Sequence, residues 1–154
     1  MNNCLFCKIA NKEIPAHIIY EDGDTIGILD ITPRAPGHTM VIPKVHGATI
    51  LEVQDATIVS LFGAVKKVTA LLQKALAPDG FTIGINHGRA SGQAVDHLHI
   101  HVIPRWLTDG GGSVHSVVNN PPQESLDAIK EKILKAAGGR VLPGELTERG
   151  DPIC

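Results

Sequence analysis

The spacing of apolar residues along the chain predicts two amphipathic helices. Between Asp55 and Leu76, apolar side chains recur at intervals of three and four residues, which places them on one face of a helix. The pattern ends at Ala77-Pro78-Asp79-Gly80, because proline and glycine stop a helix. A second such pattern begins at about Gln123 and ends at Gly138-Gly139. Its apolar stripe consists of Leu126, Ile129, Ile133 and Leu134.

Shorter apolar runs, bounded by turn residues, predict strands. The first two runs flank the turn Glu21-Asp22-Gly23-Asp24, and Asp-Gly between apolar runs is a strong hairpin signal. The last two runs are joined by the short loop N-H-G-R-A-S-G-Q, so we expect them to be antiparallel neighbours. The predicted strands cover residues 17–20, 25–31, 38–43, 81–85 and 97–104, after a short helical segment at 4–11.

Together these elements predict an α+β fold, in which an antiparallel meander sheet of about five strands carries one long packed helix, followed by a C-terminal helix. The pattern changes after Pro104, where the glycine-rich stretch L-T-D-G-G-G-S precedes the second amphipathic helix. We therefore expect one domain over residues 1–106 and a C-terminal extension over residues 107–154. The extension contains the glycine-rich loop, the helix and a poorly ordered tail from Arg140 to Cys154.

Composition and charge narrow the range of functions. The 154 residues are 43% hydrophobic and 19% charged, with a net charge of −2, which is typical of one globular domain. Nucleic-acid binding is not expected, because it needs a basic surface and usually aromatic platforms, whereas this chain has one Trp, one Tyr and three Phe. No stretch approaches the roughly 18 consecutive apolar residues of a membrane span, and the N-terminus lacks an export signal. We therefore expect a cytoplasmic protein with no membrane partner.

Three histidines alternate with apolar residues in the run H-L-H-I-H-V-I-P, which ends at Pro104. Side chains on a strand point to alternate faces, so His97, His99 and His101 share one face. A solvated strand face is the alternative interpretation, but such a face usually carries mixed polar residues. Imidazoles titrate near neutral pH and bind metals or phosphates, so the run predicts a functional site.

The cysteines indicate a second candidate site. Cys4 and Cys7 form a C-x-x-C pair, and Cys154 is the third cysteine. An odd number of cysteines without an export signal does not indicate a disulfide framework, which leaves a metal half-site or a redox pair. A thioredoxin-type redox pair begins a helix after a strand, and only three residues precede Cys4, so we favour the metal half-site.

The histidine run resembles the pattern His-φ-His-φ-His-φ-φ, with φ apolar, of the histidine triad (HIT) family of nucleotide hydrolases and transferases. The resemblance covers about the first 106 residues and implies a HIT-like fold. The sequence resembles the hydrolase branches of the family and not the uridylyltransferase branch, because Leu98 stands where the H-P-H motif of that branch has proline. The other matching blocks are Y-E-D at Tyr20, I-L-D-I at Ile28, P-G-H-T-M-V-I-P-K at Pro36 and N-H-G-R-A-S-G-Q at Asn86.

By this resemblance, His99 is the nucleophile that attacks the α-phosphorus of a nucleoside phosphate derivative and forms a nucleotidyl-histidine intermediate. A neutral imidazole suits this role, since its reference pKa is about 6.5. The resemblance implies that His101 donates to a phosphate oxygen or to the leaving group. His38 matches a histidine behind the triad that supports it, with a hydrogen-bonded core histidine as the alternative.

The remaining matches imply a binding site for a purine nucleotide of the AMP type. Asp30 corresponds to an acid that accepts hydrogen bonds from the ribose hydroxyls, with an Asx-type turn before Pro33 as the alternative. Asn86 matches an asparagine near the phosphate or the leaving group, while Gly92 and Gln93 match positions whose backbone amides approach the phosphate.

The chain departs from the family pattern at Ala94, where many members have a Ser or Thr whose hydroxyl donates to the phosphate. Loss of a hydrogen bond to a charged group costs on the order of 1.5–3 kcal/mol when nothing replaces it. His115 and the glycine-rich loop from Gly110 to Ser113 are candidate replacements for that donor.

The resemblance also completes the cysteine half-site. Family members with this N-terminal C-x-x-C take two further ligands from positions that match His46 and His97. With Cys4 and Cys7 these form a closed tetrahedral site for Zn²⁺, which implies a structural metal and no requirement for a catalytic one. The alternative is two reduced surface cysteines beside an exposed His46.

Three functions are compatible with these residues. The first is a hydrolase that cleaves nucleoside phosphoramidates, dinucleoside polyphosphates or related adenylates through His99. The second is a nucleotide-binding regulatory module with little turnover, which Ala94 favours, and the third is a zinc-dependent hydrolase with the metal on the triad itself. Family members commonly form two-fold dimers, and the apolar run F-T-I-G-I at Phe81 suits a shared sheet edge, so we expect a homodimer.

Overall fold

The computed structural model describes residues 3–139 and 141. The chain divides into two compact units, Met1–His115 and Ser116–Cys154. The division predicted from the sequence, after residue 106, stays a prediction. Apart from Val141, the predicted tail from Arg140 to Cys154 lies outside the described residues. Among the described helices, none is both long enough and apolar enough to cross a membrane.

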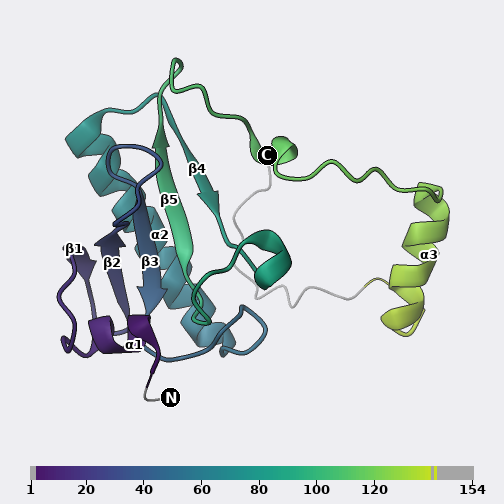
Figure 1. Cartoon of the computed structure of the whole chain (residues 1–154). Coiled ribbons are helices and arrows are strands. Elements are labelled where there is room, and N and C mark those ends of the chain that lie inside the picture. The colour runs from purple at the N-terminus through teal and green to yellow at the C-terminus, as the bar shows by residue number, and fades with distance from the viewer. Residues whose placement is uncertain (1–2, 140, 142–154) are drawn as a thin grey trace, which may run out of the picture. The chain divides into compact units, whose positions relative to one another are not determined.

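The first unit contains one antiparallel sheet of five strands, in the order β1-β2-β3-β5-β4 (Figure 1). The α+β prediction is therefore confirmed, and the strand order adds one detail to the meander. After β3 the chain crosses the sheet through a helix and returns as the edge strand β4, and β5 then inserts between β3 and β4. The strands are β1 Ile18–Glu21, β2 Thr25–Leu29, β3 Thr39–Pro43, β4 Gly80–Gly84 and β5 Ile100–Arg105.

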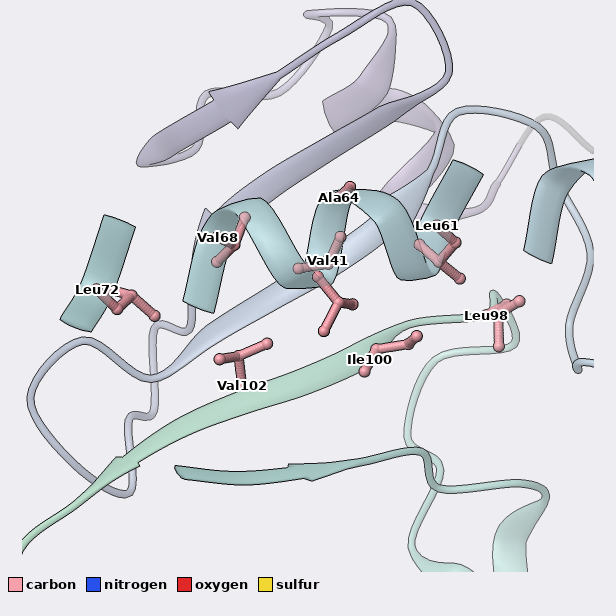
Figure 2. Close-up of a cluster of buried hydrophobic side chains, with 9 residues drawn as sticks. Val41, Leu61, Ala64, Val68, Leu72, Leu98, Ile100 and Val102 are labelled. Atoms are coloured by element: carbon pink, nitrogen blue, oxygen red, sulfur yellow. The ribbon is translucent and has the colours of Figure 1, made fainter. Parts of the chain in front are cut away.

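The long helix α2, Asp55–Leu76, has the bounds that the apolar periodicity predicts. It ends because Ala77 adopts a left-handed conformation, with φ of 46°, directly before Pro78. Its buried face packs on one side of the sheet, where side chains from the helix meet those of β3 and β5 (Figure 2). The fully buried members of this core include Val41, Leu61, Val68, Ile100 and Val102.

A second core lies on the opposite face of the sheet. There the short helix α1, Leu5–Ala10, buries Phe6 and Ile9 against apolar side chains from β2 and β3. The alternation along β5 explains how one strand serves both faces. Leu98, Ile100 and Val102 point toward α2, as Figure 2 shows, so the histidines between them face the side that carries α1.

Strand β5 begins at Ile100, three residues later than predicted. The backbone of the preceding residues bonds outside the sheet: the His97 amide donates to the Val95 carbonyl (2.8 Å) and the Leu98 amide donates to the Gly47 carbonyl (2.7 Å). Ladder pairing with β3 therefore starts only where Ile100 faces Val41. The alternation of side chains that places the three histidines on one face nevertheless extends through this segment.

The second unit contains helix α3, Leu126–Ala136, which is close to the predicted C-terminal helix. The Ser125 side chain caps it by accepting a hydrogen bond from the Ala128 amide at 3.2 Å. None of the residues of this helix is buried. In the predicted apolar stripe, Leu126 is 79% and Ile133 is 64% exposed, while Ile129 and Leu134 are half-buried.

The predicted hairpin turn between β1 and β2 is held by the Asp22 carboxylate. One of its oxygens accepts hydrogen bonds from the amides of Asp24 (3.0 Å) and Thr25 (2.8 Å) and from the Thr25 hydroxyl (2.8 Å). The Tyr20 hydroxyl donates to the other oxygen at 2.5 Å. Burial opposes ionisation of this carboxylate, but these hydrogen bonds outweigh burial and hold the pKa of Asp22 well below its usual range.

We expect Asp22→Ala to destabilise the protein by about 2 kcal/mol, because several donors lose a charged acceptor. The contribution depends on pH in a defined direction. A carboxyl group whose pKa is lowered by folding stabilises the protein above its unfolded pKa, about 3.9, and this stabilisation is lost as the pH falls below that value. Urea denaturation at pH 7 and pH 3 tests this, since the difference in stability between wild type and Asp22→Ala should shrink at pH 3. An equal difference at both pH values would contradict it.

Candidate active site and metal centre

A hydrogen bond to a nearby backbone carbonyl holds the His99 ring in one orientation. Its Nδ1 lies 2.7 Å from the carbonyl oxygen of His97, so Nδ1 carries the proton and donates. The other ring nitrogen, Nε2, then has the lone pair in the neutral ring. The His101 ring packs beside it, with centroids 5.0 Å apart and planes at 78°. The arrangement gives His99 a free imidazole lone pair next to a second histidine.

A chain of hydrogen bonds assigns the tautomer of His101. The backbone amide of Arg34 donates to His38 Nδ1 (3.2 Å), so the proton of neutral His38 is on Nε2. That nitrogen lies 2.9 Å from His101 Nδ1 and donates to it. His101 therefore carries its own proton on Nε2. The triad thus presents a lone pair on His99 and an N–H donor on His101.

Burial keeps both histidines of this hydrogen-bond chain, His38 and His101, neutral. It lowers the pKa of His101 to about 4, with smaller contributions in the same direction from His99 and His38 and an opposing one from Asp30. Burial also lowers the pKa of His38, although Asp30 opposes this shift. At neutral pH, His101 is consequently a neutral hydrogen-bond donor and not a cation.

Asp30 forms the Asx-type turn given above as an alternative, and His38 combines features of both of its interpretations. One Asp30 oxygen accepts from the amide (2.8 Å) and hydroxyl (3.2 Å) of Thr32, which is the predicted Asx-type turn. The other oxygen lies 3.6 Å from His38 Nδ1. His38 is buried and fully hydrogen-bonded, as a core histidine would be, yet its partner is His101, as a supporting role requires. Contact of Asp30 with ribose stays a prediction.

The loop before the triad is braced by the buried side chain of Gln93. Its Oε1 accepts from the Gly88 amide (2.7 Å), while its Nε2 donates to the carbonyls of Ala48 (2.7 Å) and Val95 (3.0 Å). The sequence did not indicate this role, because one partner, Ala48, comes from a separate segment. Two backbone hydrogen bonds also hold the loop: the Gly92 amide donates to the Arg89 carbonyl (2.9 Å), and the Gln93 amide donates to the Gly88 carbonyl (3.3 Å). Contact of these two amides with phosphate stays a prediction.

Gly92 has a conformation that requires glycine, with φ of 91°. The side-chain amide of Asn86 lies 3.8 Å from the point where a Cβ on Gly92 would stand. The structure therefore brings Asn86 and Gly92 together at the same end of the loop, although the role of Asn86 toward a nucleotide stays a prediction.

Gln93→Ala should destabilise the protein by about 2–4 kcal/mol, because it leaves a buried amide and two carbonyls without their partners. Gln54 provides a matched control, since its side chain is exposed and makes no capping hydrogen bond at the start of α2. Thermal denaturation of Gln93→Ala and Gln54→Ala measures the difference. Equal melting temperatures for the two variants would show that Gln93 does not brace the loop.

Four side chains from distant segments form a candidate metal centre: Cys4, Cys7, His46 and His97. His97 Nδ1 lies 3.4 Å from the sulfur of Cys4, 3.5 Å from that of Cys7 and 3.3 Å from His46 Nδ1. In a tetrahedral zinc site with bonds of about 2.3 Å to sulfur and 2.0–2.1 Å to nitrogen, neighbouring donor atoms are about 3.3–3.8 Å apart. The donor types and their spacing therefore fit zinc, and the prediction that these residues come together is confirmed.

The buried His97 is oriented for metal binding by a hydrogen bond on its far side. Its Nε2 lies 2.9 Å from the Pro43 carbonyl and donates to it, so the Nδ1 lone pair points at the cysteines. Burial lowers the pKa of His97 and raises that of Cys7, to which Cys4 also contributes. A divalent cation bound here would offset the cost of holding the cysteines as thiolates in this partly buried place.

Metal binding by the triad itself gains no support from the geometry. His97 Nδ1 faces the cysteines, and among the residues that the structure describes His99 belongs to neither group of donors that lie close enough to share a metal ion. Within the described residues, a second group with suitable donors contains Asp30, His38 and His101. Both ring nitrogens of His38 take part in the hydrogen-bond chain, which accounts for this group without a metal.

The glycine-rich loop, one of the two candidates to replace the missing hydroxyl at Ala94, lines a different cavity from Ala94. Ala94 lines a cavity of about 450 Å³ together with Cys4 and His46. The glycine-rich loop instead lines a separate cavity of about 580 Å³ beside β4, through Gly112 and Ser113. Arg105 holds that loop by donating to the Gly112 carbonyl at 2.9 Å.

Comparisons with known proteins agree with this site. A family model described as the HIT domain matches residues 11–106. An adenosine 5'-monophosphoramidase of Schizosaccharomyces pombe is 40% identical over 131 residues, which is 85% of this chain and 96% of that protein. Among solved structures, a HIT family protein from Bacillus anthracis is 31% identical with a TM-score of 0.78, over 91% of this chain and 99% of that one.

A second solved structure bears on the metal centre. A Zn-bound histidine triad family protein from Mycobacterium smegmatis is 33% identical with a TM-score of 0.67, over 88% of this chain and 93% of that one. The match of the family model, the shared fold and the arrangement of the three histidines lead to one conclusion: this chain belongs to the HIT family.

Proposed function

We propose that this protein is a nucleotide hydrolase that cleaves the bond between the α-phosphorus and the leaving group of an AMP-type substrate. The observation that carries the proposal is the hydrogen bond from His99 Nδ1 to the His97 carbonyl, which leaves a lone pair on Nε2. The substrate classes are nucleoside phosphoramidates, dinucleoside polyphosphates and related adenylates. The relative from Schizosaccharomyces pombe, an adenosine 5'-monophosphoramidase, supports the first of these.

The proposed reaction has two steps at the phosphorus. In the first, His99 Nε2 attacks the α-phosphorus, the bond to the leaving group breaks, and the leaving group departs with the electron pair. When the leaving atom is the nitrogen of a phosphoramidate, solvent water protonates it as the bond breaks, so that it leaves as the amine. In the second, water attacks the same phosphorus, the bond to Nε2 breaks, and the products are a nucleoside monophosphate and a proton. The covalent intermediate divides one difficult displacement into two easier ones.

His101 stabilises the charge that develops on the phosphate. Its neutral Nε2–H donates a hydrogen bond to a non-bridging oxygen, and His38 fixes this orientation by donating to Nδ1. Because the hydrogen bonds within the protein already define both tautomers, the rings need little reorganisation when substrate binds. His38 thereby supports catalysis from behind the triad.

The nucleotide is proposed to lie over the face of the sheet that carries α1. Asp30 binds the ribose hydroxyls, and the half-buried Ile18, at the edge of the second core, contributes to the pocket for the base. Asn86, Gly92 and Gln93 form the phosphate end of the site. The partner is therefore a small purine nucleotide.

Cys4, Cys7, His46 and His97 are proposed to bind Zn²⁺ as a closed, structural site. The ion supplies folding free energy there and joins the N-terminus to the loop after β3 and to the triad. Residues 1–106 are proposed as the catalytic domain, with 107–154 as its extension. A homodimer through the edge strand β4 is also proposed, since Ile83 of that strand is 44% exposed.

The proposal is tested by incubation with radiolabelled adenosine phosphoramidate or diadenosine tetraphosphate, followed by denaturation at alkaline pH and peptide mass spectrometry. Alkaline conditions are chosen because phosphorus–nitrogen bonds to histidine hydrolyse in acid. We expect one adenylyl group on His99. Turnover without any modified histidine, or modification of another residue, would contradict the mechanism.

A nucleotide-binding module with little turnover is the second candidate function, and Ala94 favours it because a phosphate donor is missing there. Binding of AMP with no release of product from either substrate, and no covalent adduct, would favour this second function. The two candidates are therefore separated by the same experiment.

A further inference from the structure

One aromatic ring contacts both the candidate metal centre and the candidate nucleophile. Phe6 lies between Cys4 and Cys7 in the sequence and is only 3% exposed. Its ring centroid is 5.9 Å from that of His97, with planes at 80°, and 5.2 Å from that of His99, with planes at 71°. Both contacts have the edge-to-face geometry that aromatic rings prefer.

The contact with Phe6 restricts the motion of the His99 ring. The ring contacts both Phe6 and His101, and the hydrogen bond from Nδ1 to the His97 carbonyl defines its rotation. A half-turn of the ring about the Cβ–Cγ bond would exchange Nδ1 with a carbon and move Nε2 from its place. The packing of Phe6 opposes this rotation, because a protein interior leaves little free volume around a buried ring.

The position of Phe6 depends in turn on the metal centre. Helix α1 has six residues, which is too short to be stable alone, and no side chain caps its N-terminus. Two kinds of contact hold it on the sheet: the buried side chains of Phe6 and Ile9, and the grouping of Cys4 and Cys7 with His46 and His97. A metal bound by Cys4 and Cys7 would therefore fix the turn of chain from which Phe6 projects.

We propose that Phe6 is a positioning residue that couples occupancy of the metal centre to the orientation of the His99 ring. The inference rests on the proposed function in assigning His99 as the nucleophile. It goes beyond that function by giving the structural metal an effect on the reaction, although the metal touches no substrate. Two routes connect the sites: the Phe6 ring contacts His97 and His99, and the His97 carbonyl accepts from His99.

The first test compares Phe6→Leu with Ile9→Val in the zinc-loaded, full-length protein. Both variants shorten a buried apolar side chain of α1, but only the first removes the ring against His99. We expect Phe6→Leu to retain zinc and to lower kcat by about tenfold or more with KM within about twofold, since small misplacements of reacting groups have large effects. Ile9→Val should keep the wild-type kcat. A wild-type kcat for zinc-loaded Phe6→Leu would overturn the proposal.

The second test measures the ring itself and needs no turnover. Nitrogen-15 NMR of histidine-labelled protein detects the N–H of His99 Nδ1, which Phe6 and the His97 carbonyl hold in place. Removal of zinc by a chelator should shift or broaden this signal in the wild type, and Phe6→Leu should show the same change with zinc still bound. An unchanged signal in both cases would overturn the coupling.

The two tests separate this inference from the proposed function. A wild-type protein without turnover on either substrate would contradict the proposed hydrolase, and the NMR comparison would then decide the coupling alone. Turnover through His99 combined with unaltered kinetics and NMR signals in Phe6→Leu would leave the hydrolase intact and reject the role of Phe6.

Discussion

His99→Asn is expected to reduce turnover of adenosine phosphoramidate by at least about 10³-fold, while the affinity for AMP changes by no more than about threefold. Asparagine keeps a polar side chain of smaller size but has no ring lone pair that can attack phosphorus. Steady-state kinetics and calorimetric titration with AMP measure the two quantities. The covalent adenylyl group should also be absent from this variant.

His17→Asn is the matched control, because His17 is an exposed histidine outside the site. It should have wild-type kinetics. Equal turnover by His99→Asn and wild type would remove the nucleophile from the proposed mechanism. The regulatory alternative would then gain support if binding of AMP persisted in both proteins.

The fold was largely predictable because its elements have clear periodic patterns. The helix over Asp55–Leu76 has apolar residues at helical spacing and a proline and glycine after it, so its bounds were predicted without error. The start of β5 was not predicted correctly, because the backbone amides of His97 and Leu98 donate hydrogen bonds to Val95 and Gly47 and not to a neighbouring strand. A sequence pattern gives the face on which a side chain lies, but it does not give the partner of its backbone.

The same distinction applies to the candidate site. The resemblance correctly predicted that four candidate metal ligands lie together, because a motif carries its spacing from one family member to another. It did not reveal that Gln93 braces the loop, that the Arg34 amide sets the tautomer of His38, or that Phe6 contacts His99. The contacts of Gln93 with Ala48 and of Phe6 with His99 join segments that are distant in the chain. The contact of Arg34 with His38 is local, but its geometry depends on how the loop is packed.

Cys7→Ser should abolish stoichiometric zinc binding and lower the melting temperature by about 10 °C or more. The reason is that zinc binds the folded site and not the unfolded chain, so its binding free energy counts as folding free energy. A loss of several kcal/mol corresponds to a shift of this size in a chain of this length, since each kcal/mol moves the melting temperature by roughly 2–4 °C. Elemental analysis and calorimetry measure the two effects in protein purified without chelator.

Cys154→Ser is the control, because Cys154 is outside the proposed ligand set, and we expect it to retain one zinc per chain. Stoichiometric zinc in Cys7→Ser, or its absence from the wild type, would contradict the site. The residual kcat of Cys7→Ser is informative in its own right. A purely remote metal would leave kcat unchanged in the fraction of protein that stays folded. The contacts of Phe6 with His97 and His99 instead predict that kcat falls together with zinc content.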